Sequence, residues 1–217
     1  MTPQLIGVPY DASSSFLRGS AAAPPLIRAA LRSPAGNSLT ERGADLSQLA
    51  DAGDLEISED PAAARAQIEA GIADVIAQGF TPISLGGDHS ITYPIMRAIA
   101  KHHRSVTILH IDAHGDLYDD FEGDRFSHAC PFARIIEEGL CDRLVQVGIR
   151  TLTPDQRAQI KRWGVDTIEM QHFAGDARPS TIGPVYRSPP SPKACPGRSN
   201  SATANPTCRR RASSSMR

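Results

Sequence analysis

Short apolar runs alternate with segments of helical periodicity from residue 4 to residue 186. The apolar runs predict strands over Gln4–Val8, Pro82–Leu85, Ser105–Ile111, 143–149 and 165–169. Helices are predicted between them, over 24–31, 60–78, 90–102, 131–138 and 154–162. This alternation is typical of an α/β fold with three αβα layers and a mainly parallel sheet. In such sheets, chemically active side chains gather at the carboxyl ends of the strands.

Composition narrows the class of protein. The chain has 217 residues, 40% of them hydrophobic, and a formal net charge of -1. A near-neutral balance argues against a dedicated nucleic-acid binder. No run approaches the ~18 apolar residues of a membrane span, and the first residues lack the pattern of a secretory signal. The four cysteines have no CxxC spacing, so we expect no disulfide framework and a cytoplasmic location.

The last part of the chain differs sharply from the rest. Residues 187–217 contain seven basic residues, no acidic one, and no Ile, Leu, Val, Phe, Tyr or Trp. Such a segment cannot bury enough apolar surface to offset the entropy of ordering its backbone. We therefore expect a folded domain over 1–186 and a disordered basic Ser/Pro/Arg-rich tail over 187–217. A tail of this kind is either an arm for an acidic partner or, more commonly, a solvated segment without a role.

Two candidate metal-binding motifs follow predicted strands. Gly86-Gly87-Asp88-His89-Ser90 comes directly after one strand, and its glycines permit a steep turn that presents His89. The alternative is a glycine-rich turn with a capping residue.

The segment Asp112-Ala113-His114-Gly115-Asp116 follows another strand. If it stays extended, Asp112, His114 and Asp116 point the same way and converge on a metal. Their oxygen and nitrogen donors suit Mn, Fe, Co or Zn. The alternative, a polar capping loop, crowds carboxylates together without a cation.

A third candidate is His128, in the segment Ser127-His128-Ala129-Cys130-Pro131-Phe132. A histidine there could carry protons between the site and solvent, although a lone loop histidine is usually only a surface side chain. The nearby acidic stretch 119–124 could touch a cationic substrate or could be a solvated loop.

Together, these motifs resemble the ureohydrolase family, which includes arginase, agmatinase and formiminoglutamase. The resemblance covers about residues 4–186 and is agmatinase-like around 116–132. It implies that two Mn²⁺ ions are held by His89, Asp112, His114 and Asp116, with Asp112 bridging them and His128 as the proton shuttle. It also implies hydrolysis of a guanidino compound, agmatine-like, to urea and an amine by a hydroxide bridging the ions. Family members are usually trimers or hexamers, so a homo-oligomer is expected. The resemblance assigns no substrate-binding residue here.

One family motif is missing from this sequence. The family has a later SxDxDxxDP motif that supplies two more aspartate ligands, whereas this chain has no Asp or Glu after Asp176. Pro184-Val185-Tyr186 is typical of the opening of a strand, and Arg187-Ser188-Pro189-Pro190 cannot continue a buried one. These features indicate a truncation or frameshift near Tyr186 and an incomplete C-terminus. Two functions follow: a ureohydrolase, or an inactive remnant that lacks these ligands.

Overall fold

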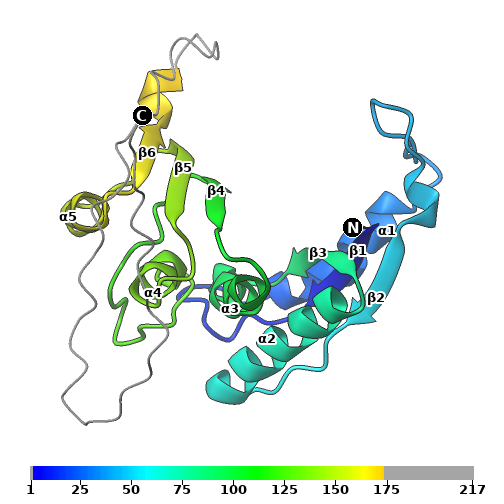
Figure 1. Cartoon of the computed structure of the whole chain (residues 1–217), viewed down its shortest axis with the longest axis horizontal. Coiled ribbons are helices and arrows are strands. Elements are labelled where there is room, and N and C mark those ends of the chain that lie inside the picture. The colour runs from blue at the N-terminus through cyan, green and yellow to red at the C-terminus, as the bar shows by residue number, and fades with distance from the viewer. Residues whose placement is uncertain (1, 174–217) are drawn as a thin grey trace, which may run out of the picture. The chain divides into compact units, whose positions relative to one another are not determined.

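The computed structural model describes residues 2–173, which belong to the compact unit Met1–Gly183. Its strands are β1 Thr2–Val8, β2 Ala50–Asp54, β3 Phe80–Gly86, β4 Thr107–Ile111, β5 Arg143–Ile149 and β6 Asp166–Glu169 (Figure 1). Its α-helices are α1 Ala23–Leu31, α2 Pro61–Ala77, α3 Thr92–His102, α4 Pro131–Glu137 and α5 Pro154–Trp163. Four short 3₁₀ helices are η1 Ser20–Ala22, η2 Leu46–Gln48, η3 His89–Ile91 and η4 Met170–Phe173. The α/β prediction is confirmed; the predicted strand opening at 184–186 and the tail 187–217 lie outside the described residues.

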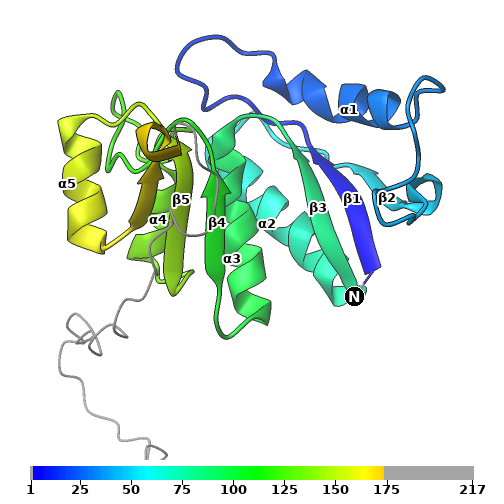
Figure 2. The same ribbon diagram turned by 90° about the horizontal axis from the view of Figure 1, so that it is seen from above.

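All strand pairs are parallel, but they form two sheets of three strands each. The first sheet has the order β2-β1-β3 and the second the order β4-β5-β6. Figure 2 shows the strands of each sheet side by side. In the described part of the chain, β3 and β4 are therefore edge strands.

Strand β2 is absent from the sequence prediction. Its residues, Ala-Asp-Ala-Gly-Asp, have neither branched side chains nor apolar alternation. Tertiary contacts form it instead: β2 pairs with β1, and Arg28 of α1 makes ion pairs with Asp51 and Asp54. The strand propensity of these five residues does not reveal such contacts, so β2 could not be predicted from the sequence.

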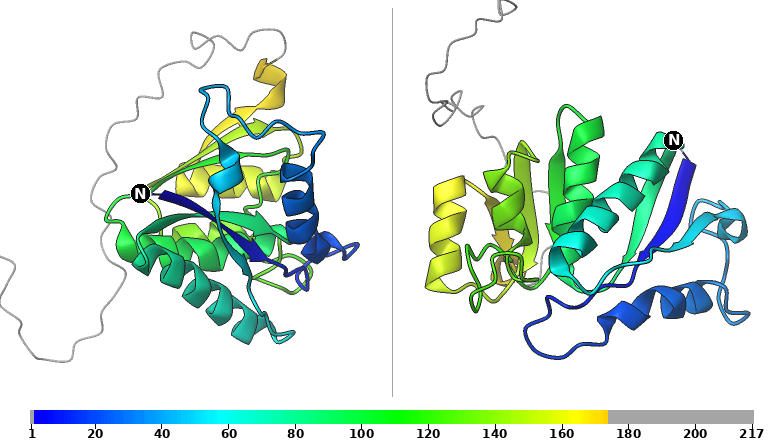
Figure 3. Two further views of the ribbon diagram at one scale, coloured as in Figure 1. Left: turned by 90° about the vertical axis from the view of Figure 1, so that its right-hand side faces the viewer. Right: turned by 90° about the horizontal axis from the view of Figure 1, so that it is seen from below.

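Helices α1 and α2 lie on opposite faces of the first sheet (Figure 3). Ile6 and Val8 of β1 are buried against Ile68 and other apolar residues of α2. A Cβ atom on Gly7, which faces the other way, would collide with Asp54 of β2 and also meet Arg28 of α1. This arrangement matches the expected layers of helix, sheet and helix.

Within residues 2–173, one face of the second sheet is covered by helices and the other is not. Ile108 and Leu144 pack with residues of α3 and α4 in a second apolar cluster. The alternate positions of β4 point away from it, and Leu109 and Ile111 are 63% and 74% exposed. Among the described residues, no helix is long and apolar enough to span a bilayer.

Replacing Leu109 and Ile111 together by threonine should reduce self-association of the 217-residue chain. Exposed apolar side chains on an edge strand favour contacts between molecules, and threonine keeps the β-propensity. Sedimentation velocity over a range of concentrations measures the effect.

Ile108→Thr, on the packed face of the same strand, is the control. It should lower the free energy of unfolding by about 1–3 kcal/mol without reducing association. Unchanged association of the double variant would show that this face is not the adhesive surface.

Candidate metal centre

One pocket of about 410 Å³ lies where β3 and β4 end. All five candidate residues from the sequence line it: His89, Asp112, His114, Asp116 and His128. The rest of its lining consists of Tyr118, Phe121, Ala129, Thr151, Thr153 and Gln156. Side chains separated by up to 67 positions in the sequence thus share one cavity.

The turn after β3 is fixed by close contact between backbones. A Cβ atom on Gly87 would lie 1.8 Å from the carbonyl oxygen of Tyr10, so only glycine fits there. The N–H of Asp88 donates to that same carbonyl. The Asp88 carboxylate accepts from the N–H of Ser90 and from the N–H of Ser13. Asp88 therefore caps η3 and connects it to the first loop of the chain, which follows β1 and contains Ser13. His89 is the first residue of η3 and lies at the pocket.

The segment after β4 bends, so the extended backbone assumed for this motif is not found, although Asp112, His114 and Asp116 all line the pocket. The chain bends from Asp112 to His114. The reason is local: the Asp112 carboxylate accepts a hydrogen bond from the N–H of His114 at 2.8 Å. Asp116 then adopts a positive φ of 45°. The His114 side chain is 62% exposed, with its Nδ1 atom 3.2 Å from Asp112 Oδ1.

Four side chains gather closely enough to hold a metal ion. They are His89, His110, Asp112 and Asp116, and one ligand atom from each lies within 4.8 Å of the others. His89 Nδ1 lies 2.7 Å from Asp116 Oδ2. Imidazole nitrogens and carboxylate oxygens are a donor set that fits Mn²⁺ and related ions. His114 stands outside this group but lines the same pocket, so its role as a ligand stays a prediction.

His110 belongs to this group but is not among the candidates predicted from the sequence, which places it within a strand. The available signal was its position: in the alternation of β4 it shares the buried face with Ile108, where a polar side chain needs a partner.

Burial and hydrogen bonding set the charges of the group. Burial and the neighbouring His89 lower the pKa of His110 to about 4, so its imidazole is neutral at physiological pH. Burial opposes ionisation of Asp112, but the N–H of His114 and the nearby imidazoles outweigh it and hold the pKa of Asp112 below its usual range. Asp112 therefore presents an ionised carboxylate, the state in which this side chain binds a metal ion.

His128 is anchored to the first loop of the chain. Its Nδ1 atom lies 2.9 Å from the carbonyl oxygen of Ser13, and its Nε2 atom 3.5 Å from Ser15 Oγ. Since a carbonyl oxygen only accepts, Nδ1 carries a proton, and in the neutral ring Nε2 is the nitrogen that bears the lone pair. Ser13 also donates its N–H to Asp88, so one loop connects His128 to the turn that presents His89.

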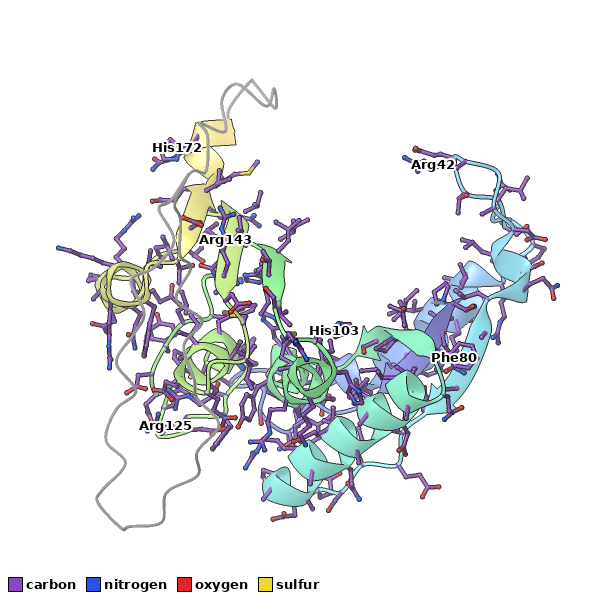
Figure 4. All side chains as sticks on the ribbon, viewed as in Figure 1. Arg42, Phe80, His103, Arg125, Arg143 and His172 are labelled. Carbon is purple, nitrogen blue, oxygen red and sulfur yellow. The ribbon has the colours of Figure 1, made fainter. Side chains whose placement is uncertain are left out.

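The acidic stretch 119–124 is engaged in holding its own loop. Asp119 accepts from buried Arg134 at 2.5 Å and from Arg125, which is labelled in Figure 4. Asp120 and Asp124 accept from backbone N–H groups of the same loop. Only Phe121 of this stretch is among the residues that line the pocket. These contacts favour the loop interpretation over contact with a cationic substrate.

The thiol of Cys130, near His128, is buried and outside the lining of the pocket. Burial raises the pKa of its thiol to about 12, so the thiolate is not populated at neutral pH. The chemistry of the pocket therefore depends on its imidazoles and carboxylates.

Parallel strands that end at a pocket with clustered histidines and aspartates define a metal-binding α/β protein. The particular family follows from comparison with known proteins, since the arginase family model matches residues 2–185. The chain belongs to the arginase family, which confirms the resemblance noted in the sequence.

The relatives include several enzymes of this family. The mitochondrial arginase of Medicago truncatula is 46% identical over 186 residues, which is 81% of this chain and 55% of that protein. The mitochondrial agmatinase of Gallus gallus is 38% identical over 151 residues, covering 67% of this chain and 44% of the relative. The solved Medicago truncatula arginase has a TM-score of 0.77 and 45% identity, covering 82% of this chain and 59% of that one.

This chain spans about half the length of the curated relatives that it matches. The higher identity is to an arginase, so the agmatinase-like specificity is not confirmed.

Replacing Gly87 by alanine should destabilise the protein and disturb the pocket, because the new methyl group collides with the Tyr10 backbone. We expect a loss of about 1–3 kcal/mol or more in the free energy of unfolding, measured by urea denaturation. Gly86→Ala is the matched control, since its Cβ would meet only the tip of the Ile91 side chain. Equal stability of the two variants would contradict this account of the turn.

Proposed function

We propose that this chain is part of a metal-dependent hydrolase that releases urea from a guanidino compound. The observation that carries the proposal is the grouping of His89, Asp112 and Asp116 in one pocket of an arginase-family chain. A cation would stabilise the grouping further, since it would offset the repulsion between the two carboxylates. The family's chemistry makes Mn²⁺ the expected ion, two per complete site.

In this proposal, His89, Asp112, His114 and Asp116 would hold the metal pair. The metals supply a water of lowered pKa that is nucleophilic at neutral pH. The protein must still bind and orient a guanidinium group, whose carbon is a poor electrophile because resonance spreads its charge over three nitrogens.

His128 is proposed to supply the proton for the leaving amine. The Ser13 carbonyl fixes the Nδ1–H tautomer, which leaves Nε2 to exchange a proton with the reacting group or with solvent. The side chain lines the same pocket as the metal group, by which we mean the cluster of His89, His110, Asp112 and Asp116. It is therefore placed for proton transfer directly or through one water.

Arginine is the first substrate to test, and agmatine the second. The sequence motifs favoured agmatine, whereas the matches to arginases extend further and are closer than the match to the agmatinase. Both substrates have the same reacting group and differ in a carboxylate far from it.

The 217-residue chain itself is proposed to be inactive or nearly so. It has no Asp or Glu after Asp176, so each ion would keep only some of its carboxylate ligands. Fewer anionic ligands weaken binding, above all of a second divalent ion. A homo-oligomer and a cytoplasmic location remain predictions; several plant relatives are named mitochondrial.

A chimera tests the function and the remnant alternative together. Residues 1–185 of this chain would be continued by the second half of Medicago truncatula arginase. We expect this chimera to retain two Mn²⁺ after dialysis and to release urea, faster from arginine than from agmatine. The 217-residue chain should retain less metal and release no urea. Metal analysis and a colorimetric urea assay measure both.

Asp112→Asn in the chimera is the control, and it should lose both metal and activity. A folded, metal-loaded chimera that releases urea from neither substrate would refute the proposed function. Urea release by the 217-residue chain would refute the proposal that it is inactive.

His128→Asn in the same chimera should lower kcat by about 10²- to 10⁴-fold, the usual contribution of a positioned acid or base. Metal content should not change, since His128 is outside the metal group. His103→Asn, on the exposed end of α3, is the control and should change neither. Full activity of the His128 variant would remove it from the proton pathway.

A further inference from the structure

A row of three polar side chains crosses the second sheet. His110 on β4 is aligned with Gln146 on β5, and Gln146 with Thr167 on β6. His110 and Gln146 are buried, at 7% and 0% exposure. A polar row on a buried sheet face costs desolvation energy, so its hydrogen bonds must be specific.

The orientation of the Gln146 amide is determined by its neighbours. Its Nε2 atom lies 2.6 Å from the carbonyl oxygen of Gly115. A carbonyl only accepts, so this atom must be the amide nitrogen. Thr167 donates its hydroxyl to Gln146 Oε1 at 3.5 Å, which supports the same orientation.

The amide in turn determines the tautomer of His110. Gln146 Nε2 also lies 3.2 Å from His110 Nδ1, and its second hydrogen is available for that contact. Nδ1 is then the acceptor, and the single proton of the neutral imidazole is on Nε2. Gly115, which anchors the amide, belongs to the same segment as Asp112 and Asp116.

The Nε2 atom of His110 is directed at the metal group. It is buried and has no hydrogen-bond partner within the described residues, and Asp112 Oδ2 lies 3.7 Å away. The ring of Phe132 packs on the imidazole with centroids 4.4 Å apart and limits its rotation. A shift of Asp112 by ~0.7 Å would bring the pair to hydrogen-bond distance.

We propose that His110 is a positioning residue that donates its Nε2–H to the carboxylate of Asp112, and that Gln146 holds it in the tautomer required. A nitrogen that carries a proton has no lone pair for a metal, so His110 acts on the ligand and not on the ion. The role in metal binding rests on the proposed function, but the tautomer does not.

The tautomer can be read in the metal-free 217-residue chain. Magic-angle-spinning NMR of ¹⁵N-histidine-labelled protein needs no soluble monomer, and it distinguishes protonated from unprotonated ring nitrogens. His110→Gln identifies the signals. We expect Nε2 to be protonated and Nδ1 unprotonated at neutral pH, and Gln146→Met to produce a mixture of tautomers. A proton on Nδ1 in the unsubstituted chain would overturn the inference, whatever the fate of the proposed function.

The effect on metal is tested with Mn²⁺ alone, by calorimetric titration of the chimera. His110→Met removes the donor and should weaken Mn²⁺ binding by about 10- to 100-fold, the usual effect of losing a hydrogen bond to a ligand. His110→Gln places an amide N–H near the position of Nε2 and should restore most of the affinity, which a purely structural role would not predict.

Thermal unfolding of each variant separates a folding defect from a binding defect. His110 is not a donor to Asp112 if the folded methionine variant binds Mn²⁺ as tightly as the unsubstituted chimera. The same conclusion follows if zinc, used as a diamagnetic probe in the NMR experiment, removes the Nε2 proton.

Discussion

The contact between His89 and Asp116 is the interaction on which the site depends. His89 follows β3 of the first sheet, and Asp116 follows β4 of the second, yet their side-chain atoms are 2.7 Å apart. No strand pairing joins β3 to β4 among the described residues, and the cluster of His89, His110, Asp112 and Asp116 is one of the contacts that join the ends of the two sheets. In the proposed enzyme, a divalent ion would strengthen this connection by neutralising the clustered carboxylates.

Much of this arrangement could be predicted from sequence because it is encoded locally. The glycine pair before Asp88, the run of branched residues before Asp112 and the proline at the start of α2 each determine structure within a few residues. Parallel topology then places motifs that follow different strands at the same end of their sheets. The positions of His89, Asp112 and Asp116 follow from these rules, and the structure brings the three together.

The features that escaped prediction depend on distant partners or on competing hydrogen bonds. Strand β2 has no strand-forming pattern and exists because of β1 and Arg28. The bend at Asp112 follows from a carboxylate that captures the N–H of His114, a contact that an extended segment cannot make. The importance of His110 depends on the register with Gln146, which is set by strand pairing. The division into two sheets is likewise a property of pairing, and periodicity reports only which face of a strand is apolar.

Two unusual features of this chain have one common explanation. The face of β4 that carries Leu109 and Ile111 is exposed, and the proposed metal group has carboxylates from only one strand end. The relatives are about twice as long as the matched region, which ends at residue 185, just before the composition changes. An additional parallel strand beside β4 could meet two requirements at once. Its apolar side chains would bury Leu109 and Ile111, and carboxylates at its end would complete the metal ligands. In the proposed enzyme, stability and metal affinity would then be coupled, since strands that bury Leu109 and Ile111 would also position further carboxylate ligands.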